Sequence, residues 1–379
     1  MHAVVRTALV ALVSGAVALG ASLAAPQTAE AATPRLTVTR VVSNLSVPWD
    51  VTWVGSLMLF DQRSGGIWSK RGSAAPHPVR MPLPNIYHTG EGGMLGVVAD
   101  PKASSNKNFY TCMAVASPNG RAKNVEVWKW RLTSDTTAVK VKPLITNIPL
   151  SSSGRHSGCR LRFRSATMLY VGTGDAAIGT NPQNLQSLGG KVLRIRGDGS
   201  IPKSNPFYAK GRNARLVWSY GHRNIQGLTF RKGKNQMWTA EHGPARDDEV
   251  NKILKGRNYG WSPTPGYNEA RSMTDKRRYP KAYSAKWRSG SSTVATSGAT
   301  FVTGSQWQSW KGRLLVAKLK GKGVMVFTVS KSGKTKRTAT ILTGYGRIRT
   351  VQQGPDGALY FTTSNVKGDV IYKVTASRR

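Results

Sequence analysis

Six similar segments recur along the chain, and each contains an apolar run, a polar turn or loop and a second apolar run. They begin at residues 57, 108, 168, 236, 313 and 358, so successive starts are 45 to 77 residues apart. Long apolar helical faces are missing, and the short runs are bounded by Gly, Asn, Asp and Pro, which is typical of an all-β chain. Six units at about the period of a four-stranded blade predict a six-bladed β-propeller, in which radial repetition leaves few exposed strand edges. A two-sheet sandwich is the alternative, but a sandwich of this length would normally divide into domains, and no linker is seen.

The N-terminus has the pattern of a secretory signal peptide. Residues 1–31 begin with a basic residue, Arg6, continue with an apolar run over 8–25 and end in small residues at Ala31. We therefore predict cleavage near Ala31, a mature single domain over 32–379, and a secreted or cell-envelope exterior location. A membrane anchor is the alternative, but no basic flank follows the run. No later segment approaches the length of a membrane span, so an integral membrane protein is not expected.

The charge of the chain is strongly positive. It has 56 Lys and Arg against 17 Asp and Glu, which gives a net charge of +39. Such a field attracts polyanions. The basic residues are spread along the chain without a nucleic-acid-binding motif, so nucleic acid is not expected as a partner. An anionic cell-wall polymer is a candidate partner, and a merely solvated cationic surface is the alternative.

The chain has two cysteines, Cys112 and Cys159, and both lie in strand-like runs. In an oxidising compartment they could form a disulfide. They could equally be two small buried apolar residues. The sequence leaves both interpretations open.

Polar residues are concentrated between Tyr220 and Trp261. This stretch contains an Arg-Asn pair, a His-Gly-Pro turn and an acidic run that ends at Glu249, in a chain with few acidic residues. Calcium prefers carboxylate and carbonyl oxygens as ligands, so a cation site is predicted here. The irregular segment 263–292 is long for a plain connection and is expected to cover or line a site.

Several long motifs occur in the order seen in the soluble quinoprotein sugar dehydrogenases. The chain therefore resembles the glucose/sorbosone dehydrogenase family, also called aldose sugar dehydrogenases, from about Val47 to its C-terminus. The motifs are GEGGMLGVVADP (90–101), RHSGCRLRF (155–163), LYVGTGD (169–175), GGKVLRIRGDGSIPKSNPF (189–207), YGHRNIQGL, EHGPARDDEVN and NYGW.

The resemblance implies a six-bladed propeller, in agreement with the repeat count, with its quinone site on the loop face near the central axis. It implies oxidation of an aldose at the anomeric carbon to a lactone, with hydride transfer to pyrroloquinoline quinone (PQQ) held with calcium. The resemblance does not identify the sugar or the electron acceptor. The loss of hydride requires a base for the sugar hydroxyl, and the resemblance assigns this role to His156.

The quinone carries three carboxylates, so its pocket should supply fixed cations, for which bidentate Arg is well suited. Alternation places Arg347 and Arg349 on one face of a strand. Thr293 is a weaker match that could be a plain strand residue, and any single basic residue could instead belong to the surface. The cofactor positions implied by the resemblance are Glu91, Arg223, Asn224, Thr293, Lys320, Arg347 and Arg349.

The resemblance also implies two calcium positions. The carbonyls of Gly243 and Pro244 would bind the ion that polarises the quinone carbonyl. Glu249 and the Tyr259 carbonyl would form a second, structural site. Asp247 or Asp248 could assist, and an exposed acidic turn is the alternative. Tyr267, with Trp261 nearby, could be an aromatic platform for the sugar, although both could equally be packing residues.

Three positions depart from the family pattern. Glu91 stands where the family usually has Gln, and a carboxylate there would repel an anionic quinone unless it is protonated or paired. Arg155 stands where some glucose-oxidising members have an acidic residue, so a preference for glucose does not follow. Cys159 replaces a small residue, which is consistent with a disulfide to Cys112.

Two other functions fit the same scaffold. One is a calcium-dependent lactonase-type hydrolase, which would have no use for Lys320, Arg347 and Arg349. The other is a non-catalytic basic propeller that binds anionic cell-surface glycans, in which His156 could be replaced without loss of binding.

Overall fold

The computed structural model describes residues 33–365 and 368–377. Residues 32–379 group into one compact unit. The signal peptide predicted over 1–31 lies outside the described residues, so it and the domain boundary stay predictions. Within the described ranges, no helix has the length and apolar character needed to cross a membrane.

The described strands form six four-stranded antiparallel sheets. In chain order, the first three sheets are β2 (Val51–Val54), β3 (Leu57–Asp61), β4 (Ile67–Arg71) and β5 (His77–Pro78); β6 (Met94–Ala99), β7 (Asn108–Ala116), β8 (Ala122–Ser134) and β9 (Thr137–Ile148); and β10 (Gly158–Phe163), β11 (Met168–Thr173), β12 (Lys191–Arg196) and β13 (Val217–Tyr220).

The remaining sheets follow the same order until the last one. They are β14 (Ile225–Arg231), β15 (Gln236–Glu241), β16 (Glu249–Ile253) and β17 (Trp287–Arg288); β18 (Thr296–Phe301), β19 (Leu314–Lys318), β20 (Val324–Val329) and β21 (Thr335–Ile341); and β22 (Ile348–Gln353), β23 (Leu359–Thr363), β24 (Asp369–Ser377) and β1 (Arg35–Leu45). Short helices lie in connections: α1 (Ala103–Asn106), and the 3-10 helices η1 (Tyr208–Lys210), η2 (Arg212–Leu216), η3 (Ser305–Trp310) and η4 (Thr343–Tyr345).

The sheets are arranged as blades around a common axis. The first strand of each sheet contacts the first strand of the next, from β2 through β6, β10, β14 and β18 to β22, and β22 contacts β2 again. This arrangement confirms the six-bladed propeller and excludes the sandwich. The six repeats recognised in the sequence coincide with the second strands, β3, β7, β11, β15, β19 and β23.

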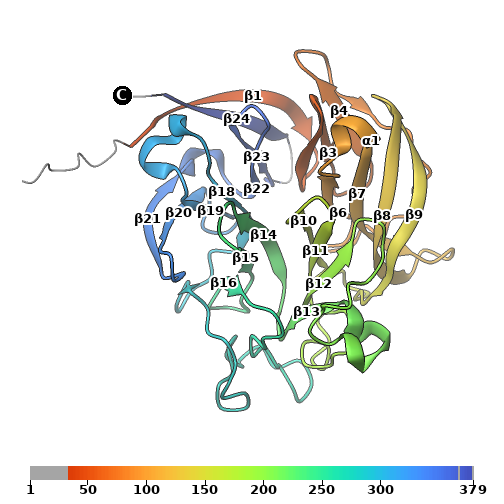
Figure 1. Ribbon diagram of the computed structural model, residues 1–379, viewed down its shortest axis with the longest axis vertical. Coiled ribbons are helices and arrows are strands. Elements are labelled where there is room, and N and C mark those ends of the chain that lie inside the picture. Colours follow the sequence, from red (N-terminus) through yellow and green to blue (C-terminus); the bar gives the residue numbers. More distant parts are fainter. Residues whose placement is uncertain (1–32, 366–367, 378–379) are drawn as a thin grey trace, which may run out of the picture. The chain divides into compact units, whose positions relative to one another are not determined.

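The sixth blade joins the two ends of the described chain. β1 pairs antiparallel with β24, from Arg35 opposite Ser377 to Leu45 opposite Asp369, with irregularities after Arg40. The N-terminal strand is thus the outer strand of the last blade (Figure 1). This closure links the first segment of the fold to the last and leaves no gap in the ring.

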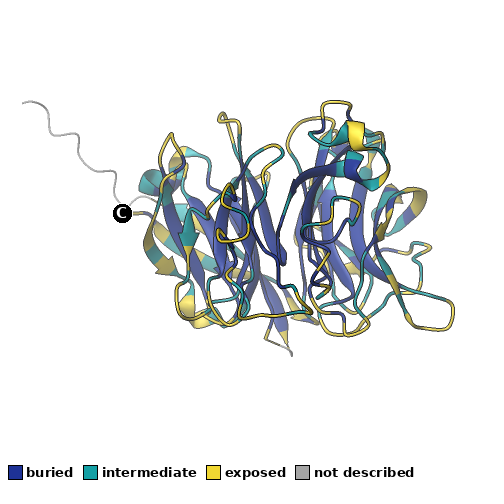
Figure 2. Cartoon of the chain, turned by 90° about the horizontal axis from the view of Figure 1, so that it is seen from below, coloured by how far each residue is buried: buried dark blue, intermediate teal, exposed yellow. Residues whose placement is uncertain are grey.

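Apolar side chains fill the spaces between blades. The strands are buried while the connecting loops carry most of the exposed residues (Figure 2). The second strands are apolar on both faces, and all five residues of β3 are buried, because each blade packs between two others. Full burial of one large apolar side chain stabilises the fold by roughly 1.5–3 kcal/mol.

A disulfide links the second and third blades. It joins Cys112 of β7 to Cys159 of β10, whose Cα atoms lie 5.9 Å apart. Both residues are fully buried in one apolar cluster. The structure therefore favours the paired interpretation of the two cysteines, beside the loop that carries His156.

The topology determines where functional side chains can gather. In each blade the first and second strands are antiparallel, so the start of the first strand and the end of the second lie at the same end of the propeller. Residues just before β6, β10, β14 and β22 therefore meet residues just after β11, β15 and β19. Glu91, His156, Arg223, Asn224, Gly243, Pro244, Lys320 and Arg347 belong to these two sets of positions, whereas Arg349 and Glu249 lie inside strands and Tyr259 and Tyr267 lie between β16 and β17.

Candidate active site

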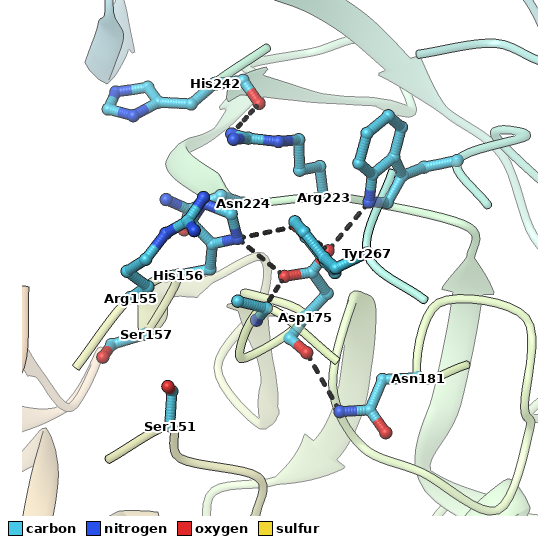
Figure 3. Close-up of polar contacts among 12 residues, drawn as sticks. Ser151, Arg155, His156, Ser157, Asp175, Asn181, Arg223, Asn224, His242 and Tyr267 are labelled. Atoms are coloured by element: carbon cyan, nitrogen blue, oxygen red, sulfur yellow. Dashed lines mark hydrogen bonds and ion pairs between the residues drawn. The ribbon is translucent and has the colours of Figure 1, made fainter. Parts of the chain in front are cut away.

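His156 lies two residues before β10, in a turn that its neighbours force into an unusual shape. His156 itself has φ = 55°, and the glycines at 154 and 158 also have positive φ. A Cβ on Gly154 would lie 1.7 Å from the Thr89 carbonyl oxygen, so only glycine fits there. The turn buries His156 and directs its ring toward Asp175, which follows β11 (Figure 3).

Asp175 is the centre of a small hydrogen-bond network. Its Oδ1 lies 2.8 Å from Nδ1 of His156, and its Oδ2 accepts hydrogen bonds from the Tyr267 hydroxyl at 2.7 Å and the Trp261 indole at 2.8 Å. The Ala177 amide donates to Oδ1. Several donors are needed because a fully buried carboxylate is unstable without them. The network assembles the predicted base and the predicted sugar platform around Asp175, for which no role was predicted.

The network determines which His156 nitrogen can act as a base. An ionised Asp175 only accepts hydrogen bonds, so Nδ1 must carry the proton and Nε2 the lone pair. Nε2 has no partner among the described residues. The Tyr267 hydroxyl also lies 2.9 Å from Nδ1, and burial and the charge of Asp175 raise the pKa of Tyr267. The phenol therefore stays a donor, and Nε2 is available to take a proton.

Arg223 connects the axis to the long segment 263–292. Its guanidinium is buried and donates to the His242 carbonyl at 3.0 Å and to Glu269 Oε1 at 2.6 Å. Arg155 donates to the same Glu269 oxygen at 2.9 Å. The contacts of Tyr267 and Glu269 show that this segment lines the site, as its length predicted.

Glu91 accepts hydrogen bonds from two neutral amides, which hold its carboxylate in place but leave it charged. The Asn224 amide donates to both carboxylate oxygens, at 3.1 and 3.0 Å, and Gln226 donates to one at 3.4 Å. Burial alone would raise the pKa of Glu91, but the neighbouring His156, the Asn224 amide and the Arg349 guanidinium hold it below its ordinary value. Glu91 is therefore ionised at neutral pH.

Arg347 immediately precedes β22 and Arg349 lies in it, and the two arginines differ in their surroundings. Arg349 is buried, lies 3.8 Å over the Trp49 ring and donates to the Gln226 side chain at 3.1 Å. Burial lowers the pKa of Arg349 to about 9, which leaves it charged at neutral pH. Arg347 is partly exposed and donates to the Ser364 carbonyl at 3.1 Å. Alternation alone did not predict this difference.

Lys320 and Thr293 form a separate pair. Nζ of Lys320, which follows β19, lies 3.4 Å from the Thr293 hydroxyl, which precedes β18. Both residues lie at the same end of the propeller as His156, by the topology of their strands. Among the residues that the structure describes, no hydrogen bond joins this pair to Glu91, Asn224 or Gln226.

Three buried donors at this end of the propeller have no hydrogen-bond partner in the described part of the chain. They are Nε2 of His242, Nε of Arg223 and Nε of Arg349. Burial lowers the pKa of His242 to about 3, so its imidazole is neutral. An unpaired buried donor is costly, so these atoms indicate that an anionic or carbonyl-bearing group belongs here.

The predicted first calcium position has free carbonyl oxygens. The carbonyls of Gly243 and Pro244 accept no hydrogen bond from the described residues, while the Gly243 amide donates to Asp248 at 2.8 Å. Asp248 also accepts from the amides of Val294 and Ala295, both at 2.6 Å. Asp248 therefore braces the turn and is not a free metal ligand.

The predicted second position contains two facing carboxylates. Glu249 of β16 lies opposite Glu241 of β15 in the sheet, and the Asn251 amide bridges them. Burial and the charge of Glu241 raise the pKa of Glu249 to about 8. The Tyr259 carbonyl accepts no hydrogen bond from the described residues. Two buried carboxylates and a free carbonyl suit a calcium ion.

Side-chain ligands alone would not be sufficient at either position. In the ranges that the structure describes, no three His, Cys, Asp or Glu residues are grouped to hold a metal. Backbone carbonyls would have to complete the coordination. Asp247 precedes β16, has φ = 56° and lies 3.7 Å from Arg288. The residue opposite Glu249 in the sheet is Glu241 and not Asp247.

Comparison with known proteins identifies the family. The family model described as Glucose / Sorbosone dehydrogenase matches residues 45–372. The chain belongs to the glucose/sorbosone dehydrogenase family. Aldose sugar dehydrogenase YliI of Escherichia coli (strain K12) is 32% identical over 343 residues, which cover 86% of this chain and 90% of the relative. This glucose/sorbosone dehydrogenase family member is thus an oxidoreductase of the sugar dehydrogenase class.

Two further similarities support the assignment. The crystal structure of the soluble aldose sugar dehydrogenase from Escherichia coli in the apo-form has a TM-score of 0.80 and 28% identity, and the match covers 90% of this chain and 99% of that one. Quinoprotein glucose dehydrogenase B of Acinetobacter calcoaceticus is 27% identical over 310 residues, which cover 74% of this chain and 63% of the relative.

Five residues of the site were given no role by the sequence: Asp175, Gln226, Glu241, His242 and Glu269. Asp175 ends the LYVGTGD motif and His242 stands in the His-Gly-Pro turn, so both lay within recognised segments. Gln226 and Glu241 lie inside strand-like runs, and Glu269 lies in an irregular segment. Only the fold brings them beside His156, Glu91, Glu249 and Arg223.

Proposed function

We propose that this family member oxidises an aldose at its anomeric carbon to the lactone, with PQQ as hydride acceptor and calcium as Lewis acid. The observation that carries the proposal is the set of unpaired buried donors on His242, Arg223 and Arg349, at the same end of the propeller as the His156–Asp175 pair. The unpaired Nε–H groups of the two arginines, which are charged donors, suit a carboxylate-bearing quinone. The similarity to a protein named a quinoprotein glucose dehydrogenase supports the same cofactor.

The residues present fit the cofactor. Arg223, Asn224 and Arg349 would hold it near the axis, with Lys320, Thr293 and Arg347 farther out on the same end. The free carbonyls of Gly243 and Pro244 would hold calcium beside it. Bound PQQ would supply the acceptor for the hydrogen and electron pair that leave the anomeric carbon.

His156 would supply the base for the sugar hydroxyl. Its Nε2 takes the hydroxyl proton as the C–H electron pair departs with hydrogen, which leaves a C=O bond at the anomeric carbon. The charge that develops on the imidazole is stabilised by Asp175, which lies 2.8 Å from Nδ1. Tyr267 and Trp261 hold Asp175 in place, so the base is oriented before the sugar arrives.

A lactonase-type hydrolase is less well supported. Metal-activated water would not require the charged groups of Arg223 and Arg349, whose Nε atoms would then stay buried without a partner. The relative from Escherichia coli is named a dehydrogenase, in line with the redox reaction.

Titration of the purified apo-protein with PQQ, with and without calcium, tests the proposal. We expect calcium-dependent uptake, followed by bleaching of the quinone absorbance when an aldose is added. A panel of aldoses then identifies the substrate, and a panel of dyes and redox proteins identifies an electron acceptor. An absence of uptake at any calcium concentration would refute PQQ as the cofactor, and lactone hydrolysis would become the next assay.

We also propose that the protein is exported after cleavage near Ala31 and acts in the cell envelope or outside the cell. The Cys112–Cys159 disulfide supports this location, because disulfides persist in oxidising compartments. N-terminal sequencing of the protein from the culture medium and from the cell envelope tests it. A mature chain that starts near residue 32 is expected, and an intact N-terminus in the cytosol would contradict it.

A further inference from the structure

A groove of about 630 Å³ lies where the first and sixth blades meet. Residues of the β2–β3 turn, the end of β4 and the β22–β23 turn line it, among them Trp53, Ser56, Lys70 and Asp356. By strand direction these turns lie at the end of the propeller opposite His156. The groove is therefore separate from the candidate active site, and its volume lies in the ~300–1,000 Å³ range of ligand clefts.

Two aromatic rings form an apolar surface in the groove. The Trp53 and Tyr360 rings lie 4.8 Å apart with an interplanar angle of 60°. Trp53 is the one residue of β2 that is not fully buried, and its indole N–H donates to none of the described residues. An aromatic face with a free polar edge is suited to a ligand that is apolar on one side and hydroxylated on the other.

The charged groups around the rings are mostly cationic. Lys373 is held by Asp356, 2.7 Å away, and the Tyr360 hydroxyl donates to the same carboxylate at 2.9 Å. Arg40 is exposed, and its side chain makes no hydrogen bond or ion pair with the described residues. Lys70 donates only to the Ala74 carbonyl. Two cations are thus available for a ligand, and Asp356 and nearby serines can bind its hydroxyls.

We propose that this groove is a binding site for an acidic oligosaccharide, distinct from the site of sugar oxidation. Trp53 stacks on the C–H face of a sugar ring, while Arg40 and Lys70 pair with its carboxylates or phosphates. Pairing with separate cations suits charges that are spaced along a glycan. A nucleic acid would bring a continuous row of phosphates against the Asp356 carboxylate, so it suits the groove less well.

Isothermal titration of the apo-protein tests the site without any dependence on the cofactor or on turnover. Three probes of equal length are compared: oligogalacturonate, which carries carboxylates, a glycerol phosphate oligomer, and neutral dextran oligosaccharide. We expect binding of at least one anionic probe, weaker binding with added salt, and at least about 10-fold weaker binding of dextran. The two anionic probes distinguish carboxylate from phosphate recognition.

Substitutions at exposed or partly exposed positions locate the site. The double variant Arg40→Glu, Lys70→Glu should weaken binding of the anionic probe at least about 10-fold. Trp53→Ala should weaken it by about 10-fold. Lys234→Glu is the matched control, since Lys234 is exposed in the β14–β15 turn at the same end of the propeller. It should change binding less than about 2-fold.

Three results would overturn the proposal. One is no binding of either anionic probe by the wild-type protein. Another is an equal loss per unit of charge in the double variant and in Lys234→Glu, which would reduce the interaction to net charge, because the double variant makes two such charge reversals and Lys234→Glu makes one. The third is tighter binding of single-stranded oligothymidylate with the same dependence on Trp53. Circular dichroism of each variant verifies folding, and aldose oxidation by the loaded double variant should equal that of the wild type.

Discussion

Nδ1 of His156 lies 2.8 Å from Oδ1 of Asp175, although the two residues stand before the first strand and after the second strand of one blade. The antiparallel pairing of β10 and β11 places those two chain positions side by side. The fold thus builds a base and its orienting carboxylate from one hairpin. Trp261 and Tyr267 contribute the remaining donors from a different part of the chain.

Asp175→Asn should lower kcat without a matching loss of cofactor uptake. An amide at this position can donate to Nδ1, so His156 would hold its proton on Nε2 and could not act as a base. General base catalysis contributes about 10²–10⁴ in rate, and we expect a loss in that range. Steady-state kinetics and PQQ titration of the variant separate the two effects. A variant with wild-type kcat would remove Asp175 from this role, and a variant without PQQ uptake would indicate a structural one.

Glu91→Gln should tighten the uptake of the anionic cofactor. The Glu91 pKa lies below its ordinary value, so the wild-type carboxylate is ionised at neutral pH and opposes a carboxylate-bearing ligand. Glutamine keeps the size of the side chain and can still accept from the Asn224 amide. Removal of one unfavourable charge contact near the surface of a pocket should lower the Kd about 10-fold.

The pH dependence provides a control for Glu91→Gln. PQQ uptake by the wild type should strengthen as pH falls below 4.5, because Glu91 then becomes protonated. PQQ uptake by Glu91→Gln should lack this pH-dependent increase. Equal affinity of the two proteins at every pH would show that Glu91 does not face the cofactor.

The fold was predictable because its repeats are local. A buried second strand requires a run of apolar residues, and the runs at Leu57, Asn108 and Met168 carried that signal. The closure by β1 was not predicted. Residues 35–45 alternate in exposure and carry several charges, as an outer strand does, and nothing local identifies β24 as their partner.

The site was predictable only where a motif is long. His156, Arg223 and Asn224 lie in such motifs, whereas Glu269 acts through contacts made 46 and 114 residues away in the chain. The charge state of Glu91 also depends on distant partners, because Asn224 is 133 residues away. A sequence pattern states which groups are present, and the tertiary structure determines which of them are paired.

Calcium should stabilise the protein through Glu249. The carboxylates of Glu249 and Glu241 face each other in a buried position, so a bound cation would relieve their repulsion. At a free calcium concentration 100 times the Kd, the free energy of unfolding should rise by about 2.7 kcal/mol. Urea unfolding with EDTA and with calcium measures this. Glu249→Gln should lose most of the calcium effect, and an unchanged effect in that variant would place the stabilising ion elsewhere.

The raised pKa of Asp61 should make the free energy of unfolding decrease as pH rises. Burial and the charge of Asp50 raise the Asp61 pKa well above its ordinary value, so the folded state holds a proton that the unfolded state releases above about pH 4. Between those two pKa values the free energy of unfolding decreases by up to about 1.4 kcal/mol per pH unit from this group. Asp61→Asn retains an acceptor for the amides of Trp49 and Asp50 but has no proton to lose.

The difference in unfolding free energy between Asp61→Asn and the wild type should therefore increase with pH from about 4 upward. Asp50→Asn is the contrasting control. Burial would raise the pKa of Asp50, but Arg162 and Arg160 outweigh burial and lower it, so ionised Asp50 stabilises the fold above its unfolded pKa. Asp50→Asn should therefore lose stability relative to the wild type as pH rises from the folded-state pKa of Asp50 to its unfolded-state pKa. The Asp50 change lies below the ordinary pKa of 3.8 and the Asp61 change above it, so urea unfolding from about pH 2.5 to about pH 9 gives both curves, and a flat difference for Asp61→Asn would show that Asp61 stays ionised in the folded protein.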